Sequence, residues 1–290
     1  MSVVTTVSAA PHRVIAMLQL LGSRTEPWRR TDLLGVFAPP ALQAKRPDAD
    51  PEDSDYDRGL IRELGTLGLV ETRGAGLVAL SSVGRVALED PLRWFRTTLT
   101  SPSVAAAVGQ GEVPPAIAWL LGRDPLSGLA WQGNYKDEVI AEFGRDLDLS
   151  NLTKAQQLFH WARYLGFCWV SSHGNSRQIV YPDPTMAVES LIREGDLPRG
   201  RDIPMAEFLK WLGSTCPVLD SAGDELVAAP QATEAGQSSL RASLGVALEQ
   251  LALDGLLSFD NKSDAKTVLL GPPGTTRRVA THIKILGGPS

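Results

Sequence analysis

The sequence has 290 residues, of which 43% are hydrophobic and 21% charged, as in soluble proteins with two or three globular domains. No apolar run approaches the ~20 residues of a membrane helix, and no signal peptide is indicated. The net charge is −5, and Lys plus Arg number 10 against 12 Asp plus Glu in residues 1–90, 7 against 10 in 110–195, and 8 against 10 in 200–290. This composition argues against a domain that binds DNA tightly on its own, because DNA affinity comes largely from the neutralisation of phosphate charges.

The two cysteines, Cys168 and Cys216, are far apart in the sequence and form no metal-ligand pair. The four histidines are also scattered. We therefore expect a reduced, cytoplasmic protein with no metal and no cofactor.

The first ninety residues predict one module. Helices are expected over 11–21 and 31–37, followed by an acidic, Pro-rich surface loop over 45–54. Leu60, Ile61, Leu64 and Leu67 have helical spacing. Gly68 should end their helix, and a strand that begins at Leu69 should form a hairpin with strand 77–80, around the turn 73–76, before a short helix over 83–88.

A linker is expected over 91–113, and a second module over 114–195. Its predicted elements are helices over 114–121 and 135–143, a helix capped by Asn151 and ended by Gly166, a hairpin of strands 167–171 and 178–181, and a last helix over 184–193.

A third, divergent module is expected over 203–290. A helical stripe begins at Met205, and the region 216–237 reads either as a long loop or as a loop with a short helix near 231–236. A further helix should end at Gly255. Strands 256–259 and 267–270 are expected to pair around the turn 260–265, and 278–285 should form a closing strand.

The three modules share a helix, a stop glycine and an apolar strand start. Gly68, Gly166 and Gly255 are 98 (166 − 68) and 89 (255 − 166) residues apart. Leu69, Phe167 and Leu256 follow them. A period near 90 suits a repeated small domain.

The segment LGLVETRGAGLVALSSVGRVAL, within residues 11–90, resembles the helix end, wing and trailing helix of winged helix-turn-helix proteins. The resemblance implies a mostly helical α+β fold with small β-hairpins, in three tandem winged-helix domains. Members of that superfamily bind duplex DNA or use the same surface to bind protein. Arrays of this kind also resemble accessory subunits of prokaryotic DNA-modification and anti-phage systems.

Side chains on the third helices and wings are the candidate nucleic-acid contacts. Gln can pair with adenine and Arg with guanine in the major groove, and a wing Arg suits the minor groove or the backbone. A solvated polar face is the alternative interpretation. The candidates are Lys154, Gln157, Arg163, His173 and Arg177 in the second module and Arg58 and Arg62 in the first.

No catalytic set has local support in the sequence. The segment 271–276, GPPGTT, lacks the order and the lysine of a phosphate-binding loop. We therefore expect a non-enzymatic DNA-binding or scaffolding subunit, with protein subunits and double-stranded DNA as partners and no membrane or small-molecule substrate. The alternatives are a dimeric, stand-alone winged-helix transcriptional regulator, and an enzyme with its site between modules.

Overall fold

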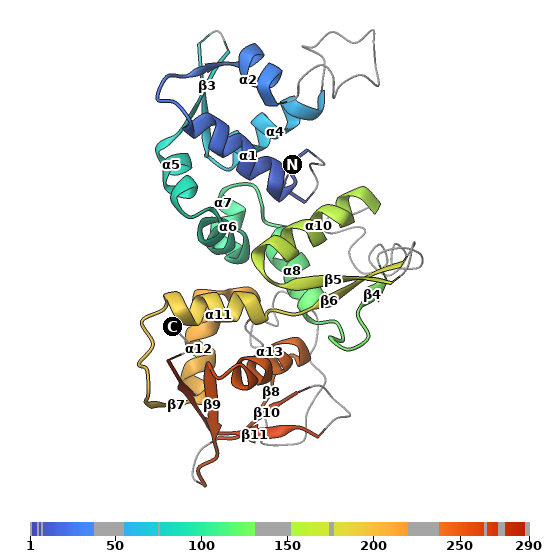
Figure 1. Ribbon diagram of the computed structural model, residues 1–290, viewed down its shortest axis with the longest axis vertical. Helices are drawn as coiled ribbons and strands as arrows, with labels where there is room; N and C mark the ends of the chain where they lie inside the picture. The colour runs from blue at the N-terminus through green and yellow to red at the C-terminus, as the bar shows by residue number, and fades with distance from the viewer. Residues whose placement is uncertain are drawn as a thin grey trace. The chain divides into compact units, whose positions relative to one another are not determined.

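The computed structural model describes residues 2–4, 6, 8–37, 55–74, 76–130, 152–173, 177–219, 238–263, 266–271 and 276–287 (Figure 1). The chain divides into two compact units. Unit 1 comprises Met1–Leu99, Ser103–Val113 and Val139–Trp161, and unit 2 comprises Thr100–Pro102, Pro114–Glu138 and Ala162–Ser290. The fold is mixed α+β, with helices and small three-stranded sheets. The predicted loop over 45–54, the predicted helix over 135–143 and the segment 220–237 lie outside the described residues.

The first ninety residues form helices around one small sheet. Its strand order is β1-β3-β2, and both pairings are antiparallel. Helix α1 packs against β3 and α5. The elements are α1 (Pro11–Gly22), β1 (Trp28–Arg29), α2 (Arg30–Phe37), α4 (Asp55–Thr66), β2 (Val70–Arg73), β3 (Leu77–Leu80) and α5 (Ser82–Glu89).

The segment predicted to be a linker, 91–113, is largely helical. It contains α6 (Pro91–Thr100) and α7 (Pro102–Ala107). Phe95 in α6 is fully buried, and its ring lies 5.0 Å from that of Trp161. Apolar packing therefore holds this segment in helices, whereas its prolines and polar residues led to the prediction of a linker.

The remaining elements supply three further sheets. Their strand orders are β4-β6-β5, β7-β12-β9 and β11-β10-β8, in which only the described β10–β8 pairing is parallel. The elements are α8 (Val113–Leu121), β4 (Leu129–Ala130), α10 (Leu152–Leu165), β5 (Cys168–His173), β6 (Arg177–Pro182), α11 (Thr185–Glu194), β7 (Asp202–Pro204), α12 (Met205–Thr215), a 3-10 turn (Pro217–Leu219), β8 (Ser238–Ser239), α13 (Ala242–Leu253), β9 (Leu257–Asp260), β10 (Val268–Leu270), β11 (Arg278–Ala280) and β12 (His282–Ile285).

Three helices end in the same hydrogen-bonded cap. The stop glycines have φ values of 72°, 87° and 75°, the left-handed region that glycine adopts without strain. In each case the next residue donates its backbone N–H to the carbonyl five residues earlier, as in a Schellman motif. The pairs are Leu69 to Leu64, Phe167 to Ala162 and Leu256 to Leu251, at 2.8, 2.8 and 2.9 Å. The predicted helix stops are thus confirmed.

The hairpins after these caps also close in the same way. The residue after each return strand donates its backbone N–H to the carbonyl of the residue after the glycine. The pairs are Ser81 to Leu69, Asp183 to Phe167 and Leu286 to Leu256. We call the three arrangements helix–hairpin units: α4–β2–β3, α10–β5–β6 and α13–β9–β12.

The predicted pairing within the third hairpin is wrong. Strand β9 pairs with β12, whereas β10 pairs with β11 and β8. Alternation does not separate the two candidates, because β10 and β12 both bury every second residue, Val268 and Leu270 in one and Ile283 and Ile285 in the other. The residues from 261 to 281 are therefore an insertion within this hairpin.

Helix α11 joins the second and third helix–hairpin units. The Ala187 backbone N–H bonds to the Gly166 carbonyl at the end of α10, and α11 also packs against α13 (Figure 1). At its far end, Gly195 lies against Trp211 of α12, where an added Cβ would meet the indole ring at 2.6 Å. Helix α11 thus packs against both the second and the third helix–hairpin unit, although the sequence suggests a domain boundary between residues 195 and 203.

Candidate nucleic-acid interface

On the first helix–hairpin unit, the structure places Arg62 on the exposed side of α4. Leu60, Leu64 and Leu67 fill the opposite side of that helix. The side chain of Arg58 lies outside the described residues. The exposed position of Arg62 is compatible with a contact to a ligand.

The predicted face of α10 is only partly at the surface. Arg163 and His160 are exposed, but Gln157 is just 6% exposed, and its Oε1 atom has no hydrogen-bond partner among the described residues. Gln157 is one helical turn before Trp161, which is fully buried and donates its Nε1–H to the Ala9 carbonyl at 2.9 Å. The N-terminal segment thus covers a side of α10 that the sequence assigns to solvent.

For the other predicted contacts of the second helix–hairpin unit, the structure describes only the backbone. Lys154 is in α10, and His173 and Arg177 are cross-strand partners at the end of the β5–β6 hairpin. The side chains of these three residues lie outside the described residues. Of the seven predicted contacts, Arg62 and Arg163 have described, exposed side chains.

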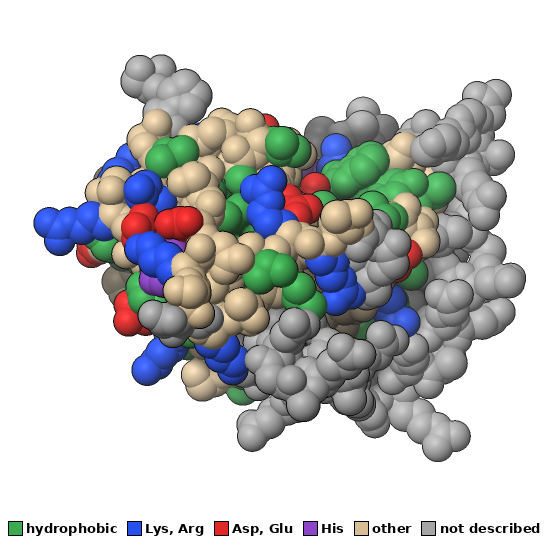
Figure 2. Space-filling model, turned by 90° about the horizontal axis from the view of Figure 1, so that it is seen from below, with side chains coloured by type: hydrophobic (Ala, Val, Ile, Leu, Met, Phe, Trp, Pro, Cys, Tyr) green, Lys and Arg blue, Asp and Glu red, His purple; other side chains and the backbone are tan. Residues whose placement is uncertain are grey.

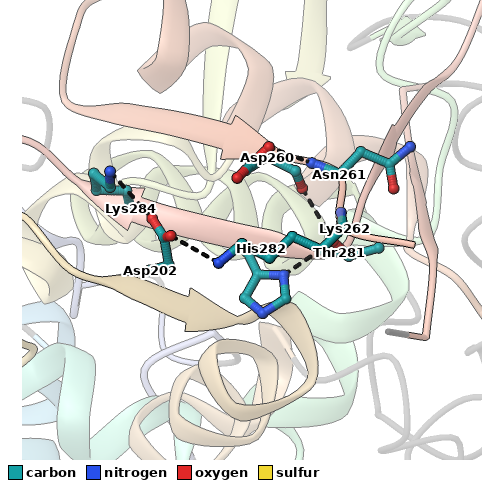
Figure 3. Close-up of polar contacts among 7 residues, drawn as sticks. All are labelled: Asp202, Asp260, Asn261, Lys262, Thr281, His282 and Lys284. Carbon is teal, nitrogen blue, oxygen red and sulfur yellow. Dashed lines mark hydrogen bonds and ion pairs between the residues drawn. The ribbon is translucent and has the colours of Figure 1, made fainter. Parts of the chain in front are cut away.

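The third helix–hairpin unit carries a basic surface that was not predicted from the sequence. Alternation along β7 and β12 places Asp202 and Lys284 opposite each other on the outer face of the sheet. Lys262, just after β9, reaches the same carboxylate, and His282 lies on the same face of β12 (Figure 3). We call Asp202, Lys262, His282 and Lys284 the β12 surface.

Two lysines share one aspartate on the β12 surface. Lys262 Nζ lies 2.8 Å from Asp202 Oδ2, and Lys284 Nζ lies 3.1 Å from Oδ1. The pKa of Asp202 is lowered most by its hydrogen bond with Lys262 and next by that with Lys284. The Lys262–Asp202 hydrogen bond also raises the pKa of Lys262. These three charges sum to +1, and the nearby charge of Asp260, which also raises the pKa of Lys262, brings the local sum to zero. Any attraction for an anion therefore depends on the basic residues around the cluster.

Thr281 holds the backbone next to this cluster. Its Oγ1 accepts a hydrogen bond from the Lys262 backbone N–H at 2.8 Å, and lies 3.2 Å from the Asp260 carbonyl and 3.0 Å from His282 Nδ1 (Figure 3). Thr281 is 1% exposed. This buried hydroxyl fixes the turn from which Lys262 extends toward Asp202.

Positive charge extends beyond the β12 surface. Residues 199–215, 257–263, 266–271 and 276–287 hold eight basic and three acidic side chains, a local charge of +5 in a chain of net charge −5. Figure 2 shows Lys and Arg side chains spread over the described part of one face, with Asp and Glu beside some of them. The basic residues are Arg199, Arg201, Lys210, Lys262, Lys266, Arg277, Arg278 and Lys284, and the acidic ones are Asp202, Glu207 and Asp260.

Helix α13 of the same unit is buried on most sides. Leu244, Leu248 and Leu251 are at most 2% exposed, and the helix contacts α11, β9 and β10. It contains no Lys or Arg. Arg241, immediately before it, donates from Nη1 to the carbonyls of Ala118 and Val218, both at 3.1 Å. This helix cannot present a basic face to a DNA groove.

The described residues show neither a metal site nor a membrane-spanning helix. Within the described ranges, no group of three or more His, Cys, Asp and Glu side chains is arranged to hold a metal ion. None of the helices in that part of the chain has the length and apolar composition that a bilayer span requires.

Comparison with known proteins identifies the family. Residues 1–265 match the family model described as DpdG-like. DpdG is a component of the Dpd DNA-modification (7-deazaguanine) system. No curated protein and no solved structure gives a significant match. Because the match covers most of the sequence, the chain belongs to the DpdG-like family.

Proposed function

We propose that this protein is a non-catalytic subunit of a Dpd DNA-modification system, built from tandem winged-helix units. In this role it contacts duplex DNA on a limited surface and binds other Dpd proteins through its remaining faces. Membership of an anti-phage defence assembly follows from the same proposal. The family match supports the assignment to the Dpd system. The repeated helix–hairpin unit supports the proposed binding of DNA and protein.

The observation that carries the proposal is the repeated helix–hairpin unit. Among the described residues of the first ninety, the order is α1, β1, α2, α4 and the β2–β3 hairpin, and in the sheet order β1-β3-β2 the return strand is in the centre. The sheets β4-β6-β5 and β7-β12-β9 also have the return strand in the centre. This order is that of a winged helix, whose third helix and wing bind macromolecules.

Two buried ionisable groups among the described residues have raised pKa values. Burial raises the pKa of Glu63, which accepts hydrogen bonds from Gln110 and Thr6. Burial also raises the pKa of the Cys168 thiol to about 12. A thiol held in its neutral form is a poor nucleophile, so Cys168 does not have the properties of a covalent catalyst.

Duplex binding by the intact chain tests the DNA part of the proposal. We expect fluorescence anisotropy to show binding to a duplex of about three helical turns, with affinity that falls as salt rises. The triple variant Lys154→Ala, Arg163→Ala, Arg177→Ala should bind more weakly and with a shallower salt dependence. Failure of the parent to bind at low salt would remove DNA contact from the proposal.

Co-purification tests the scaffolding part. The chain, expressed with the other Dpd proteins, should remain bound to at least one of them through size-exclusion chromatography. If the protein binds neither DNA nor any Dpd protein, the proposed function is wrong. A stable homodimer that binds DNA without Dpd partners would instead favour a stand-alone regulator.

A further inference from the structure

We infer that the third helix–hairpin unit contacts the phosphate backbone of duplex DNA through the β12 surface and the basic residues around it, and not through helix α13. This inference rests on the proposed DNA contact and specifies which face makes it. The contact would carry no direct sequence information, because phosphates are the same at every base pair.

Charge complementarity selects DNA as the partner. The described residues of 199–215 and 257–287 carry a surplus of five positive charges. Their basic side chains are mostly exposed, including those of Lys262, Lys284 and Arg278. Arg278 also lies over the ring of Phe259, 5.7 Å from its centroid, which places the start of β11 beside β9. The insertion therefore adds cations to the wing rather than a separate surface.

The third helix is unsuited to reading bases. Because α13 is covered on much of its surface by α11 and the inserted strand β10, and contains no Lys or Arg, it offers no basic face to a major groove. Gly245 of α13 and Gly271 after β10 are in close backbone contact, so the cover cannot be lifted without separating the packed elements. Recognition by this unit is left to the wing and its flanking loops.

Asp202 limits the strength of this contact. Its carboxylate holds both Lys262 and Lys284 and cancels one of their charges. Replacement by asparagine removes that charge while keeping the size of the side chain. Asp202→Asn should therefore strengthen duplex binding, an outcome that loss of folding cannot imitate.

The test compares two variants that make the same change in net charge. Asp202→Asn alters the β12 surface, whereas Glu189→Gln alters an exposed α11 residue paired with Arg193 at 2.7 Å. One added phosphate contact at about 0.1 M salt corresponds to about a tenfold gain in affinity, and steepens the salt slope by about one unit. We expect this gain for Asp202→Asn, on duplexes of unrelated sequence alike, and little change for Glu189→Gln.

The converse variant is Lys262→Ala with Lys284→Ala, which should weaken binding to all duplexes and flatten the salt slope. If both variants bind like the parent, or if Glu189→Gln gains as much as Asp202→Asn, the third wing is not the contact, while the proposed function stands. If the parent does not bind duplex DNA at low salt, both the inference and the proposed DNA contact are overturned. A change in the order of preference among duplex sequences would show base reading and contradict backbone contact.

Discussion

Gly245 in α13 lies so close to Gly271 after β10 that the Gly271 backbone leaves no room for a side chain at position 245. A Cβ added there would lie 2.7 Å from the Gly271 backbone nitrogen. Gly271 itself has a φ of 88°, a conformation that other residues rarely adopt. This pair of glycines sets the distance at which the inserted strands cover α13.

Gly245→Ala should destabilise the protein although alanine is the better helix former. The added methyl group meets backbone atoms, which cannot rotate aside, so α13 and β10 must move apart. Overpacking of this kind costs about 1–3 kcal/mol. Denaturant unfolding followed by circular dichroism measures the loss.

Gly65→Ala in α4 is the matched control. Gly65 is an exposed helical residue with nothing within 4 Å of an added Cβ. This substitution should stabilise the protein by about 0.5–1 kcal/mol, because it lowers the entropy of the unfolded chain and improves helix propensity. Equal effects of the two substitutions would contradict the close contact at Gly245.

A buried glutamate should make unit 1 less stable at neutral pH than in mild acid. Glu63 is 1% exposed. Its Oε1 accepts from Gln110 Nε2 at 2.6 Å and its Oε2 from Thr6 Oγ1 at 3.2 Å. Loss of solvation raises its pKa above the ordinary value of 4.5, and the two hydrogen bonds only partly offset this. The folded state therefore binds a proton more readily than the unfolded state does.

The sign of the pH dependence follows from this difference. As pH rises from 4.5 through the raised pKa, the contribution of Glu63 to the free energy of unfolding falls, and above that pKa the loss is constant. Glu63→Gln keeps an acceptor for Gln110 and a donor for Thr6, so it should be more stable than the parent at neutral pH, with the advantage shrinking in acid. Glu63→Ala leaves Gln110 without this partner and should lose about 1–3 kcal/mol. Unfolding curves across this pH range would show a constant difference if Glu63 did not titrate.

Local signals were sufficient for the parts of the fold that depend on neighbouring residues. A glycine after an amphipathic helix, followed by alternating apolar residues, predicts a Schellman cap and a strand, and Gly68 and Gly166 have this role. The hairpin β2–β3 closes over a short turn, so its pairing also follows from nearby residues. Helix boundaries agree to within a few residues for the same reason.

Long-range packing decided the features that the sequence did not reveal. Strand β9 has two apolar, β-prone candidates for a partner, and the more distant β12 is the one that pairs. Gln157 has the polarity of a surface residue but lies on the side of α10 covered by the N-terminal segment. The basic surface was hidden because acidic residues elsewhere in 200–290 cancel its charge in a sequence count.

Both cysteines should resist thiol reagents in the folded protein. Burial raises the pKa of Cys168 to about 12, so at about pH 8 only about one molecule in ten thousand carries the reactive thiolate. Cys216 is 1% exposed and lies 3.6 Å from Thr100 Oγ1. A chromogenic disulfide reagent should label neither residue until denaturant is added. Met186→Cys introduces a thiol at a position that is 72% exposed and should be labelled at once; rapid labelling of the parent would contradict the buried environment.

Because α11 serves two helix–hairpin units, weakening it should loosen both. Val188 of α11 is fully buried, and Val188→Ala should cost about 1–3 kcal/mol through the cavity it leaves. Hydrogen exchange read by mass spectrometry should then show faster exchange in the β5–β6 hairpin and in α13 together, with α1 and α4 of unit 1 unchanged. Met186→Ala, on the exposed side of the same helix, should leave all these rates near those of the parent. Faster exchange in only one of the two hairpin units would mean that α11 belongs to that unit alone, and that the boundary predicted near residue 195 separates independent folding units.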